Sequence, residues 1–599
     1  MNEAEPSKTN ALSSGRPDHD RLKAANEAGG LTKLRTYVSL SGPGYLQSAI
    51  TLGGGSLAGS LYLGVLAGPG MLWVQPLAML FGIIMLSAIA YVTLATGRRP
   101  FEAINTEVNP VFGWGWALAA FVANMVWVMP QYALAVGVFQ QNLLPGVFGE
   151  DGLLPHVVSN LILVSAIFAG ALWVTWSYGK PGPGVRLFEL LLKLMVAFIV
   201  LAFVGVVFRL AIEPGALNWR EIFSGFIPNP GMLTRPADGF EVILAHLPSE
   251  FAGYWREIIV GDQRGVVVTT AATAVGINMT FIFGYSLLRR RWTREFRGFV
   301  KFDLATGMLI PFLVATSCVV VAAASQFHGV PQHGLMEAEE IAEVRREIGQ
   351  DERAHPTGDR QASARQRADY QALLLERALL AKNDRDAATV LEELGALAGD
   401  DRDDRIAELI GGTTRYDRYL AATLVHRNSF DLANALEPLL GWAFSQIVFG
   451  LGVFGMTFSS IVMLMVISGI GFCEFFHKPH EGKWFRIGSL FPVTGLLGAF
   501  FWAGQPWLVV PTSVFAFLLI PLAYISFFAL MNQKRLLGVD MPTGRRRVAW
   551  NLLMGVALLI IVPSSLFVLH DRYGWSGMMV AAGFVVFAGA VHLLRARRG

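Results

Sequence analysis

The chain has 599 residues, of which 53% are hydrophobic and only 16% are charged, with a formal net charge of +3. Long apolar runs recur from end to end, which excludes a soluble globular protein and indicates a polytopic helical membrane protein. The two cysteines, Cys318 and Cys473, both lie in or beside apolar segments, so neither a disulfide framework nor a thiolate metal cluster can be built from them.

The chain begins with a polar segment, residues 1–35, which has no apolar core. Such a segment is expected to be a disordered cytoplasmic tail and not a cleavable signal peptide. We expect transmembrane helices 1–7 within residues 36–329 and helices 8–12 within residues 437–599. The apolar segments that predict these twelve spans lie near 38–66, 70–95, 113–144, 157–177, 186–211, 265–288, 300–327, 436–473, 486–503, 507–532, 548–570 and 575–594.

The connections between the predicted spans alternate in charge. Lys and Arg cluster in every second connection, most densely in Arg289–Lys301, whereas the short connections 67–69, 145–155 and 504–506 are poor in basic residues. Because cytoplasmic loops carry an excess of Lys and Arg, both termini are expected in the cytoplasm. The sequence therefore predicts a multi-pass protein of the cell membrane.

A long polar segment, residues 330–436, separates the seventh and eighth predicted spans and would lie outside the cytoplasm. Within it, residues 370–382 and 387–397 have apolar residues at helical spacing, which predicts a small helical extracytoplasmic insertion. One interpretation is a solvated insertion rich in ion pairs that binds no ligand. The other is a lid over the outer vestibule.

The first span contains three adjacent glycines, Gly53, Gly54 and Gly55, followed by Ser56. Adjacent glycines weaken a helix, and a broken helix at mid-membrane is the best sequence pointer to the binding site of a transporter. Free backbone N–H groups at the start of the second half-helix, with Ser56 as its cap, would attract an anionic group such as a carboxylate. The alternative is that the glycines, which also form Gly-x-x-x-Gly pairs, only allow close helix packing.

Helices 1–5 and 6–10 are interpreted as two inverted halves, with helices 11 and 12 added. The second broken helix should then be the sixth, Thr269–Leu288, because Gly276, Asn278, Thr280 and Gly284 interrupt its large apolar residues. Polar and glycine residues at the centre of a span indicate either a site or close packing.

The order of several motifs resembles the Nramp family of divalent-metal transporters, over roughly residues 40–325 and 440–540. The resemblance implies the LeuT-like fold of the amino acid–polyamine–cation superfamily, with its 5+5 inverted repeat. The motifs that carry it are Gly42-Pro43-Gly44, the glycine-rich break, Met71–Val74, Thr96-Gly97 with Asn109-Pro110, Gln141–Leu144, Asp303, Gly450–Ser460, Ile520–Leu522 and Met531–Gly538.

The positions of the family's metal site differ in this chain. The Asp-Pro-Gly-Asn of the first helix falls on Gly53, Gly54, Gly55 and Ser56, and the Met-Pro-His of the sixth falls on Phe283, Gly284 and Tyr285, with Met279 four residues earlier. The acidic pair of the third helix falls on Pro130 and Ala133, and a polar residue of the eighth is kept in kind as Thr457. A divalent ion placed here without a carboxylate would not recover the free energy lost with its hydration shell.

These observations predict an Nramp-like secondary-active transporter that has lost its usual transition-metal site and carries another small solute or a weakly coordinated cation. The alternatives are a Mg²⁺ or Mn²⁺ transporter with an altered site, and a non-transporting membrane sensor or structural protein. We expect no enzymatic activity, no cofactor and no nucleic-acid partner; the expected partners are the lipid bilayer and a small-molecule or ion substrate, and the oligomeric state is left open. The expected substrate-binding residues are Gly53, Gly54, Gly55, Ser56, Asn278, Thr280, Phe283, Gly284, Tyr285 and Thr457, and no residue is predicted to bind a metal.

Overall fold

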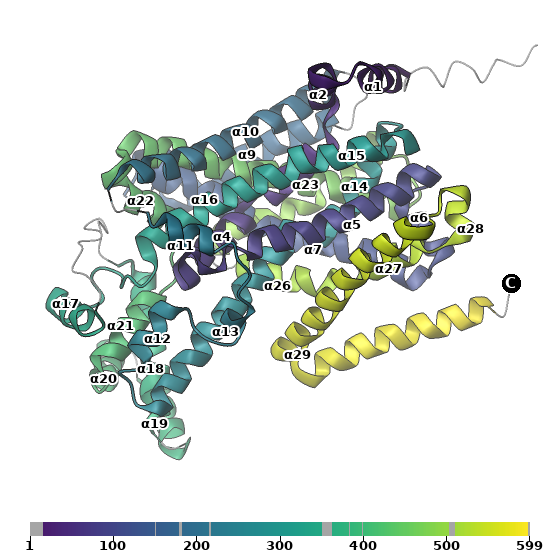
Figure 1. Ribbon diagram of the computed structural model, residues 1–599. Coiled ribbons are helices and arrows are strands. Elements are labelled where there is room, and N and C mark those ends of the chain that lie inside the picture. Colours follow the sequence, from purple (N-terminus) through teal and green to yellow (C-terminus); the bar gives the residue numbers. More distant parts are fainter. Residues whose placement is uncertain are drawn as a thin grey trace, which may run out of the picture.

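The computed structural model describes residues 16–149, 151–178, 183–214, 217–349, 362–382, 384–397, 399–501 and 509–596, and every regular element in them is a helix. A bundle of long helices makes up most of the molecule, and a lobe of shorter helices projects from one end (Figure 1). The first half of the bundle comprises α3 (Pro43–Thr51), α4 (Gly54–Ala67), α5 (Val74–Thr96), α6 (Pro100–Glu107), α7 (Pro110–Val138), α8 (Pro145–Phe148), α9 (His156–Tyr178) and α10 (Pro183–Ile212).

The second half of the bundle begins with a broken helix, as the first half does. It comprises α13 (Ser249–Ala274), α14 (Ile277–Arg289), α15 (Arg297–Leu304), α16 (Ile310–Phe327), α23 (Phe449–Phe475), α24 (Gly482–Gly488), α25 (Gly498–Phe501), α26 (Val509–Leu519), α27 (Pro521–Met531), α28 (Lys534–Leu537) and α29 (Gly544–Ala596). Short 3-10 or π-helical turns join several of these helices, at Gly68–Met71, Phe139–Leu143, Arg294–Phe296, Ala305–Leu309, Ala443–Val448, Phe491–Leu497 and Gly538–Asp540.

The number of membrane-crossing helices agrees with the prediction. Ten helical stretches of the described chain are long and apolar enough to cross a membrane, or eleven when the bent pair α3 and α4 is counted as one span. Gly574, with φ of 57°, divides α29 into two arms that form a hairpin beside the bundle (Figure 1), and counting both arms gives twelve. Large apolar side chains on both arms, such as Leu559 and Phe587, face outward, as expected for helices that contact lipid.

The bundle is organised around α23 and α4. The first packs against α3, α7, α9 and α10, and the second packs against α13, α16 and α26. Both helices are apolar on every side, which is the pattern of a helix surrounded by others. They therefore hold the broken helix α3–α4 in the middle of the fold.

The amino-terminal segment differs from the expectation of a disordered tail where the structure describes it. Residues 16–40 form α1 (Arg16–Ala28) and α2 (Gly30–Leu40), while residues 1–15 lie outside the described chain. Leu22 and Ala25 are buried, and the Tyr37 ring packs edge-on against Phe299 and Phe302, with both centroid distances 5.1 Å. Tertiary contacts with α15, which local sequence does not reveal, order this segment.

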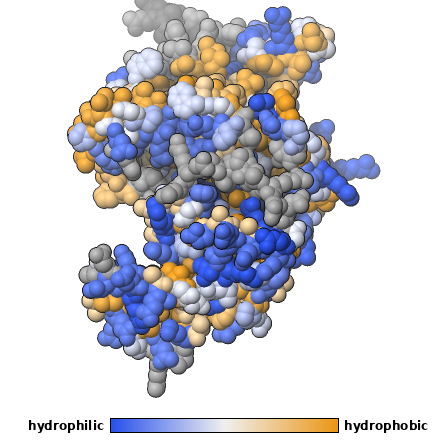
Figure 2. All heavy atoms as spheres, turned by 90° about the vertical axis from the view of Figure 1, so that its left-hand side faces the viewer, coloured by the Kyte–Doolittle hydropathy of each residue, from blue (hydrophilic) through white to orange (hydrophobic). Residues whose placement is uncertain are grey.

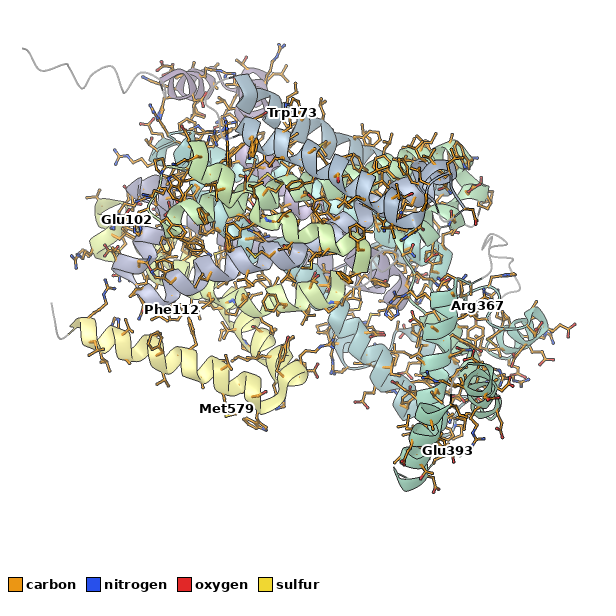
Figure 3. The ribbon with its side chains drawn as sticks, turned by 180° about the vertical axis from the view of Figure 1, so that it is seen from behind. Glu102, Phe112, Trp173, Arg367, Glu393 and Met579 are labelled. Atoms are coloured by element: carbon orange, nitrogen blue, oxygen red, sulfur yellow. The ribbon has the colours of Figure 1, made fainter. Side chains whose placement is uncertain are left out.

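The projecting lobe is built from two distant parts of the chain. Residues of the segment between α10 and the bundle part of α13 contribute α11 (Trp219–Ser224), a turn at Pro230–Leu233 and α12 (Asp238–Leu244). The insertion contributes α17 (Ala338–Glu347), α18 (Ala364–Leu380), α19 (Asp384–Ala396), α20 (Asp400–Gly411) and α21 (Arg415–Leu424) to the lobe, whereas its last helix, α22 (Ser429–Leu440), packs on the bundle against α16, α10 and α4 (Figure 1). Hydrophilic residues predominate on the lobe in Figure 2, and Arg367 and Glu393 mark it in Figure 3, far from Met579 on the second arm of α29.

Capping residues explain where several helices of the insertion begin. Ser363, Thr414 and Asn428 each accept a hydrogen bond from a backbone N–H in the first turn of α18, α21 and α22. In all three, the third helical residue returns a bond to the cap, which is a capping box. The helical character predicted for the insertion is therefore encoded locally.

Candidate functional site

The first helix is broken at the predicted glycines. Between α3, which ends at Thr51, and α4, which begins at Gly54, the chain bends by 54°. Gly53 is extended, with φ of −106° and ψ of 179°. A Cβ atom on Gly53 would collide with the Ser460 hydroxyl of α23, so glycine is required here for the close approach of two helices as well as for the break.

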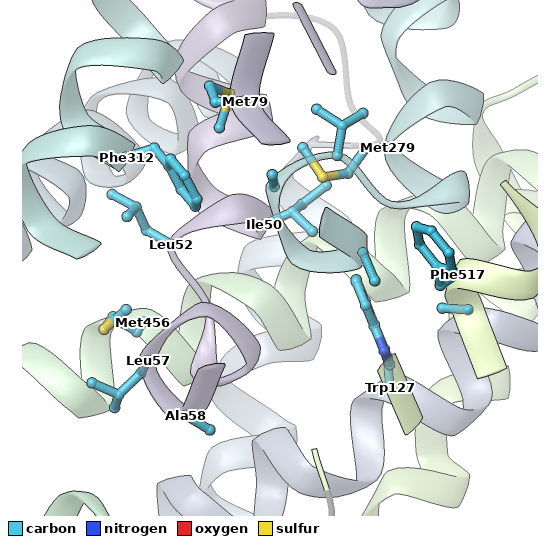
Figure 4. Packing of buried hydrophobic residues seen from close by; sticks show 14 of the residues in the cluster. Ile50, Leu52, Leu57, Ala58, Met79, Trp127, Met279, Phe312, Met456 and Phe517 are labelled. Atoms are coloured by element: carbon cyan, nitrogen blue, oxygen red, sulfur yellow. The ribbon is translucent and has the colours of Figure 1, made fainter. Parts of the chain in front are cut away.

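The second broken helix lies directly against the first. Its halves, α13 and α14, are separated by Val275 and Gly276, both in extended conformations. The Thr51 hydroxyl donates a hydrogen bond to the carbonyl oxygen of Ala274 at 3.2 Å, and the Gln47 amide donates one to the carbonyl oxygen of Met279 at 3.4 Å. The two interruptions therefore meet at one point, around Ile50, Leu52 and Met279 in Figure 4.

A narrow cavity of about 10 Å³ opens beside the first break, which is room for about one water molecule. None of its lining side chains is charged, and the indole N–H of Trp127 is buried there without a hydrogen-bond partner. The cavity is lined by Ile50, Gly53, Gly55, Ser56, Trp127, Pro130, Gln131, Thr273, Ser460 and Leu464.

The backbone N–H of Gly54 and the hydroxyl of Ser56 make hydrogen bonds that differ from those predicted from the sequence. The backbone N–H of Gly54 donates to the side-chain oxygen of Gln131 at 3.0 Å, so this donor is already occupied. The Ser56 hydroxyl donates to the carbonyl oxygens of Thr51 and Gly53 and does not cap α4, whose N-cap residue is Gly53. The expectation of a Ser56 cap is wrong because the carbonyl groups at the break lack helical partners and accept the hydrogen bond of this hydroxyl instead.

A second cavity of about 10 Å³ lies on the side of α4 that faces the insertion. Arg427 from the insertion lines it and is only 2% exposed. Its Nη2 donates to the carbonyl oxygen of Val330 at 3.0 Å, and burial lowers its pKa to about 10, so the guanidinium is still protonated at neutral pH. Three buried polar atoms of the lining have no hydrogen-bond partner, namely Arg427 Nε, Tyr62 Oη and Ser429 Oγ. The remaining lining residues are Gly54, Leu57, Ala58, Leu61, Leu134 and Asn428.

The predicted residues of the sixth helix fall into two groups. Asn278 and Thr280 lie in the first turn of α14, where Asn278 donates to Asn124 at 3.2 Å and Thr280 accepts from Trp116 at 2.9 Å. Both side chains therefore join α14 to α7 by hydrogen bonds near the break.

The second group of predicted residues on α14 lies away from the break. Phe283, Gly284 and Tyr285 follow Gly276 by seven to nine residues, or about 10 to 14 Å along the helix. Gly284 packs against Pro100, and the ring of Tyr285 lies 5.3 Å from that of His480. The structure therefore does not bring these three residues to the cavity.

The predicted residue on α23, Thr457, lies beside the first break. Its hydroxyl donates to the carbonyl oxygen of Val453 at 3.1 Å. A Cβ atom on Gly54 would lie 3.5 Å from its methyl group. Thr457 therefore presents an apolar surface to the break.

Three side chains at the breaks lie outside the predicted set of binding residues: Met279, Arg427 and Gln131, of which Gln131 is a polar residue within the third apolar segment and on that ground a candidate to line the cavity or to join two helices. The Met279 sulfur accepts from the Thr51 hydroxyl at 3.6 Å and from the Gly276 N–H at 3.4 Å. Counting from the glycine that breaks the helix, instead of from the aligned motif, would have found it. Gln131 has a local signal, because it is polar within an apolar span, whereas Arg427 lies in the polar insertion and is brought to α4 by packing alone.

The site carries no cluster of anionic ligands in the part of the chain that is described. No three His, Cys, Asp or Glu side chains come together there as a possible metal site. The fold and the paired breaks define a polytopic helical membrane protein with two discontinuous helices in contact at mid-bundle.

Comparison with known proteins identifies the family. The family model described as "Natural resistance-associated macrophage protein-like" matches residues 44–348 and 419–569, and the chain belongs to this Nramp family. The residues between these segments, 349–418, lie within the insertion and are not matched by the family model.

Individual relatives are distant. The chain is 28% identical to "Metal transporter Nramp2" of Populus trichocarpa over 167 residues, which are 27% of this chain and 28% of the relative. It is 24% identical to "Divalent metal cation transporter MntH" of Brucella suis over 319 residues, which are 53% of this chain and 60% of the relative. A crystal structure of the manganese transporter of Eremococcus coleocola is similar over 94% of this chain and 95% of the other, with 13% identity and a TM-score of 0.48.

Proposed function

We propose that this Nramp-family protein is a secondary-active transporter whose substrate is a small solute or a weakly coordinated, still hydrated cation. The observation that carries the proposal is the uncharged lining of the cavity at the first break. A transition-metal ion that sheds its water needs anionic or strongly dipolar ligands in return. Backbone carbonyls and the Ser56 hydroxyl supply dipoles there but no negative charge.

The buried guanidinium of Arg427 supports the same proposal. It lies in the second cavity, on the side of α4 that faces the insertion, together with the unpartnered hydroxyl groups of Tyr62 and Ser429. Asp431 lies close enough to act electrostatically on Arg427 and offsets part of its charge, but the unpartnered Nε can donate a charge-assisted hydrogen bond to a substrate with a carboxylate or other anionic group. On this proposal, residues 330–436 act as a lid on the outer side, because Arg427 belongs to them.

The broken helices provide the moving parts of the proposed transporter. The half-helix α3 is held at its start by the Asp303 carboxylate, which accepts from the N–H groups of Gly42 at 3.0 Å and Gly44 at 2.6 Å. Its far end is free to bend because Leu52 and Gly53 are not helical. Release of the Asp303 contact would expose the break to one side of the membrane, and withdrawal of Arg427 would expose it to the other. On this proposal both termini lie in the cytoplasm.

A second candidate is a transporter of Mn²⁺ or Mg²⁺ with an altered site. For Mn²⁺ the favouring observation is the thioether of Met279 at the junction of the two breaks, because soft sulfur ligands select transition metals. The names of the plant and bacterial relatives point to metal transport as well. For Mg²⁺ the widened, small-residue break could admit an ion that keeps its water shell.

Uptake into proteoliposomes distinguishes these candidates. The purified full-length protein would be screened with Mn²⁺, Mg²⁺, amino acids and polyamines, alongside the variants Arg427→Gln and Met279→Leu. We expect solute uptake that Arg427→Gln reduces at least tenfold and Met279→Leu changes little. Binding of Mn²⁺ with micromolar affinity that is abolished by Met279→Leu or Ser56→Ala would instead establish the metal candidate. Absence of uptake for every class would favour a non-transporting sensor.

A further inference from the structure

A groove of about 610 Å³ lies between α5, α15 and the first arm of α29, far along the bundle from the two breaks. It is lined by Ile83, Ile84, Ser87, Tyr91, Arg297, Gly298, Lys301, Pro542, Arg546, Ala549, Trp550 and Leu553. The groove is thus built by three separate helices, and nothing in the proposed transport site uses it.

One end of the groove is strongly basic. Arg297, Lys301 and Arg546 line it, and none of its lining residues is acidic. Arg297 pairs with a carboxylate beside the groove, because its Nη1 donates to Asp540 at 3.2 Å. Arg297 Nε and Nη2 are buried without a hydrogen-bond partner. Arg297 therefore contributes a largely buried positive charge, and the exposed Lys301 and Arg546 supply the donors that an anionic ligand can reach.

Aromatic rings hold the basic side chains in position. The Arg297 guanidinium lies over the ring of Tyr91 at 4.0 Å from its centroid, and Lys301 Nζ lies 6.0 Å from that of Trp550. Tyr91 is itself fixed, because its hydroxyl donates to the carbonyl oxygen of Asp540 at 2.7 Å. Tyr and Trp are enriched at membrane–water interfaces, so these rings are suited to a groove at the end of a span.

The other end of the groove is apolar. Ile83 precedes Tyr91 on α5 by eight residues, or about 12 Å, and Leu553 follows Arg546 on α29 by seven, or about 10 Å. Leu553 is 47% exposed, so this end is open toward the surface that contacts lipid. The charge therefore sits near the end of the span, where the basic connections are predicted to be cytoplasmic, and the apolar wall extends toward the bilayer centre.

We propose that this groove binds an anionic phospholipid of the bilayer. The phosphate would contact Arg297, Lys301 and Arg546, and one acyl chain would lie along Ile83, Ile84 and Leu553. Basic pockets between transmembrane helices recognise anionic headgroups in this way. A free phosphate would satisfy only the basic end, whereas a phospholipid fits both ends and the spacing between them.

Lipid binding to the full-length protein in detergent tests the proposal. Native mass spectrometry would compare phosphatidylglycerol with phosphatidylcholine of the same acyl chains, and glycerol phosphate would serve as the headgroup alone. The variants are Lys301→Gln and Arg546→Gln, and the matched control is Arg545→Gln, one residue earlier on the same helix and outside the groove. Each groove variant is expected to weaken phosphatidylglycerol binding about fivefold, the effect of one basic residue at an anionic surface.

The expected pattern is preference for phosphatidylglycerol, loss of that preference in both groove variants, retention in Arg545→Gln, and no measurable competition by glycerol phosphate. Equal binding of the two lipids, or equal weakening by Arg545→Gln, would overturn the site. Competition by glycerol phosphate at the same concentration as the lipid would overturn the acyl-chain contact. If a variant misfolds, the site is tested on the wild-type protein with a phosphatidylglycerol that carries a photoreactive acyl chain. The labelled residues must then include Ile83, Ile84 or Leu553, and labelling elsewhere only would overturn the site.

Discussion

The strongest single anchor of the projecting lobe is a buried ion pair, and its removal gives the sharpest prediction. Asp417 of α21 is fully buried and accepts hydrogen bonds from Arg377 Nε at 2.9 Å and Trp255 Nε1 at 2.8 Å. It also accepts from the Thr414 backbone and side chain at 2.9 and 2.8 Å. Arg377 belongs to α18 and covers the ring of Phe251 on α13, so one carboxylate joins two helices of the insertion to the bundle.

Asp417→Asn should destabilise the lobe by about 3 to 5 kcal/mol, because it leaves the buried guanidinium of Arg377 without its counter-charge. At about 1.4 kcal/mol per factor of ten, that corresponds to a loss of at least about 100-fold in the amide exchange protection of α18 and α21. Hydrogen exchange measured by mass spectrometry on the full-length protein would show it.

The matched control is Glu408→Gln, which removes the 2.6 Å contact with Arg405 and should leave the exchange protection nearly unchanged, because solvent screens an exposed ion pair. If Asp417→Asn lowers protection no more than this control, the buried pair does not hold the lobe in place. The reasoning would then fail at its central step.

Three further predictions concern the bundle and its outer edge. Asp303→Asn removes the charge that holds the N–H groups of Gly42 and Gly44 and should cost about 2 kcal/mol, seen as faster exchange of the amides at the start of α3. Gly44→Ala should lower the thermal unfolding temperature at least as much, because its Cβ would collide with the Asp303 carbonyl oxygen; an unchanged temperature would contradict the close approach. Burial lowers the pKa of His328, whose Nδ1–H donates to the Val65 carbonyl oxygen at 2.9 Å. The unfolded chain therefore binds more protons, and stability should be full above about pH 6.5 and fall on acidification. His328→Asn should remove that part of the pH dependence in unfolding experiments at pH 5 to 7.

Local sequence determines the helical framework. The apolar runs predict the spans because each segment is by itself long and apolar enough to cross the hydrocarbon core of a bilayer as a helix. The breaks at Gly53 and Gly276 are also predictable, since residues without a Cβ atom weaken a helix wherever they stand. The same holds for the insertion helices, whose caps lie within three residues of the backbone groups they satisfy.

Only the tertiary structure decided which groups meet at the breaks. The partners of Gly54 and Thr51 are 77 and 228 residues away, at Gln131 and Met279, and Arg427 reaches α4 from the far end of the insertion. Alignment by motif predicts that Phe283, Gly284 and Tyr285 lie at the site. In the structure they lie about two to three helical turns beyond the break, where Tyr285 contacts His480. Hydropathy and glycine spacing act within one segment, whereas the chemistry of the site depends on how distant helices pack, and no local pattern encodes that.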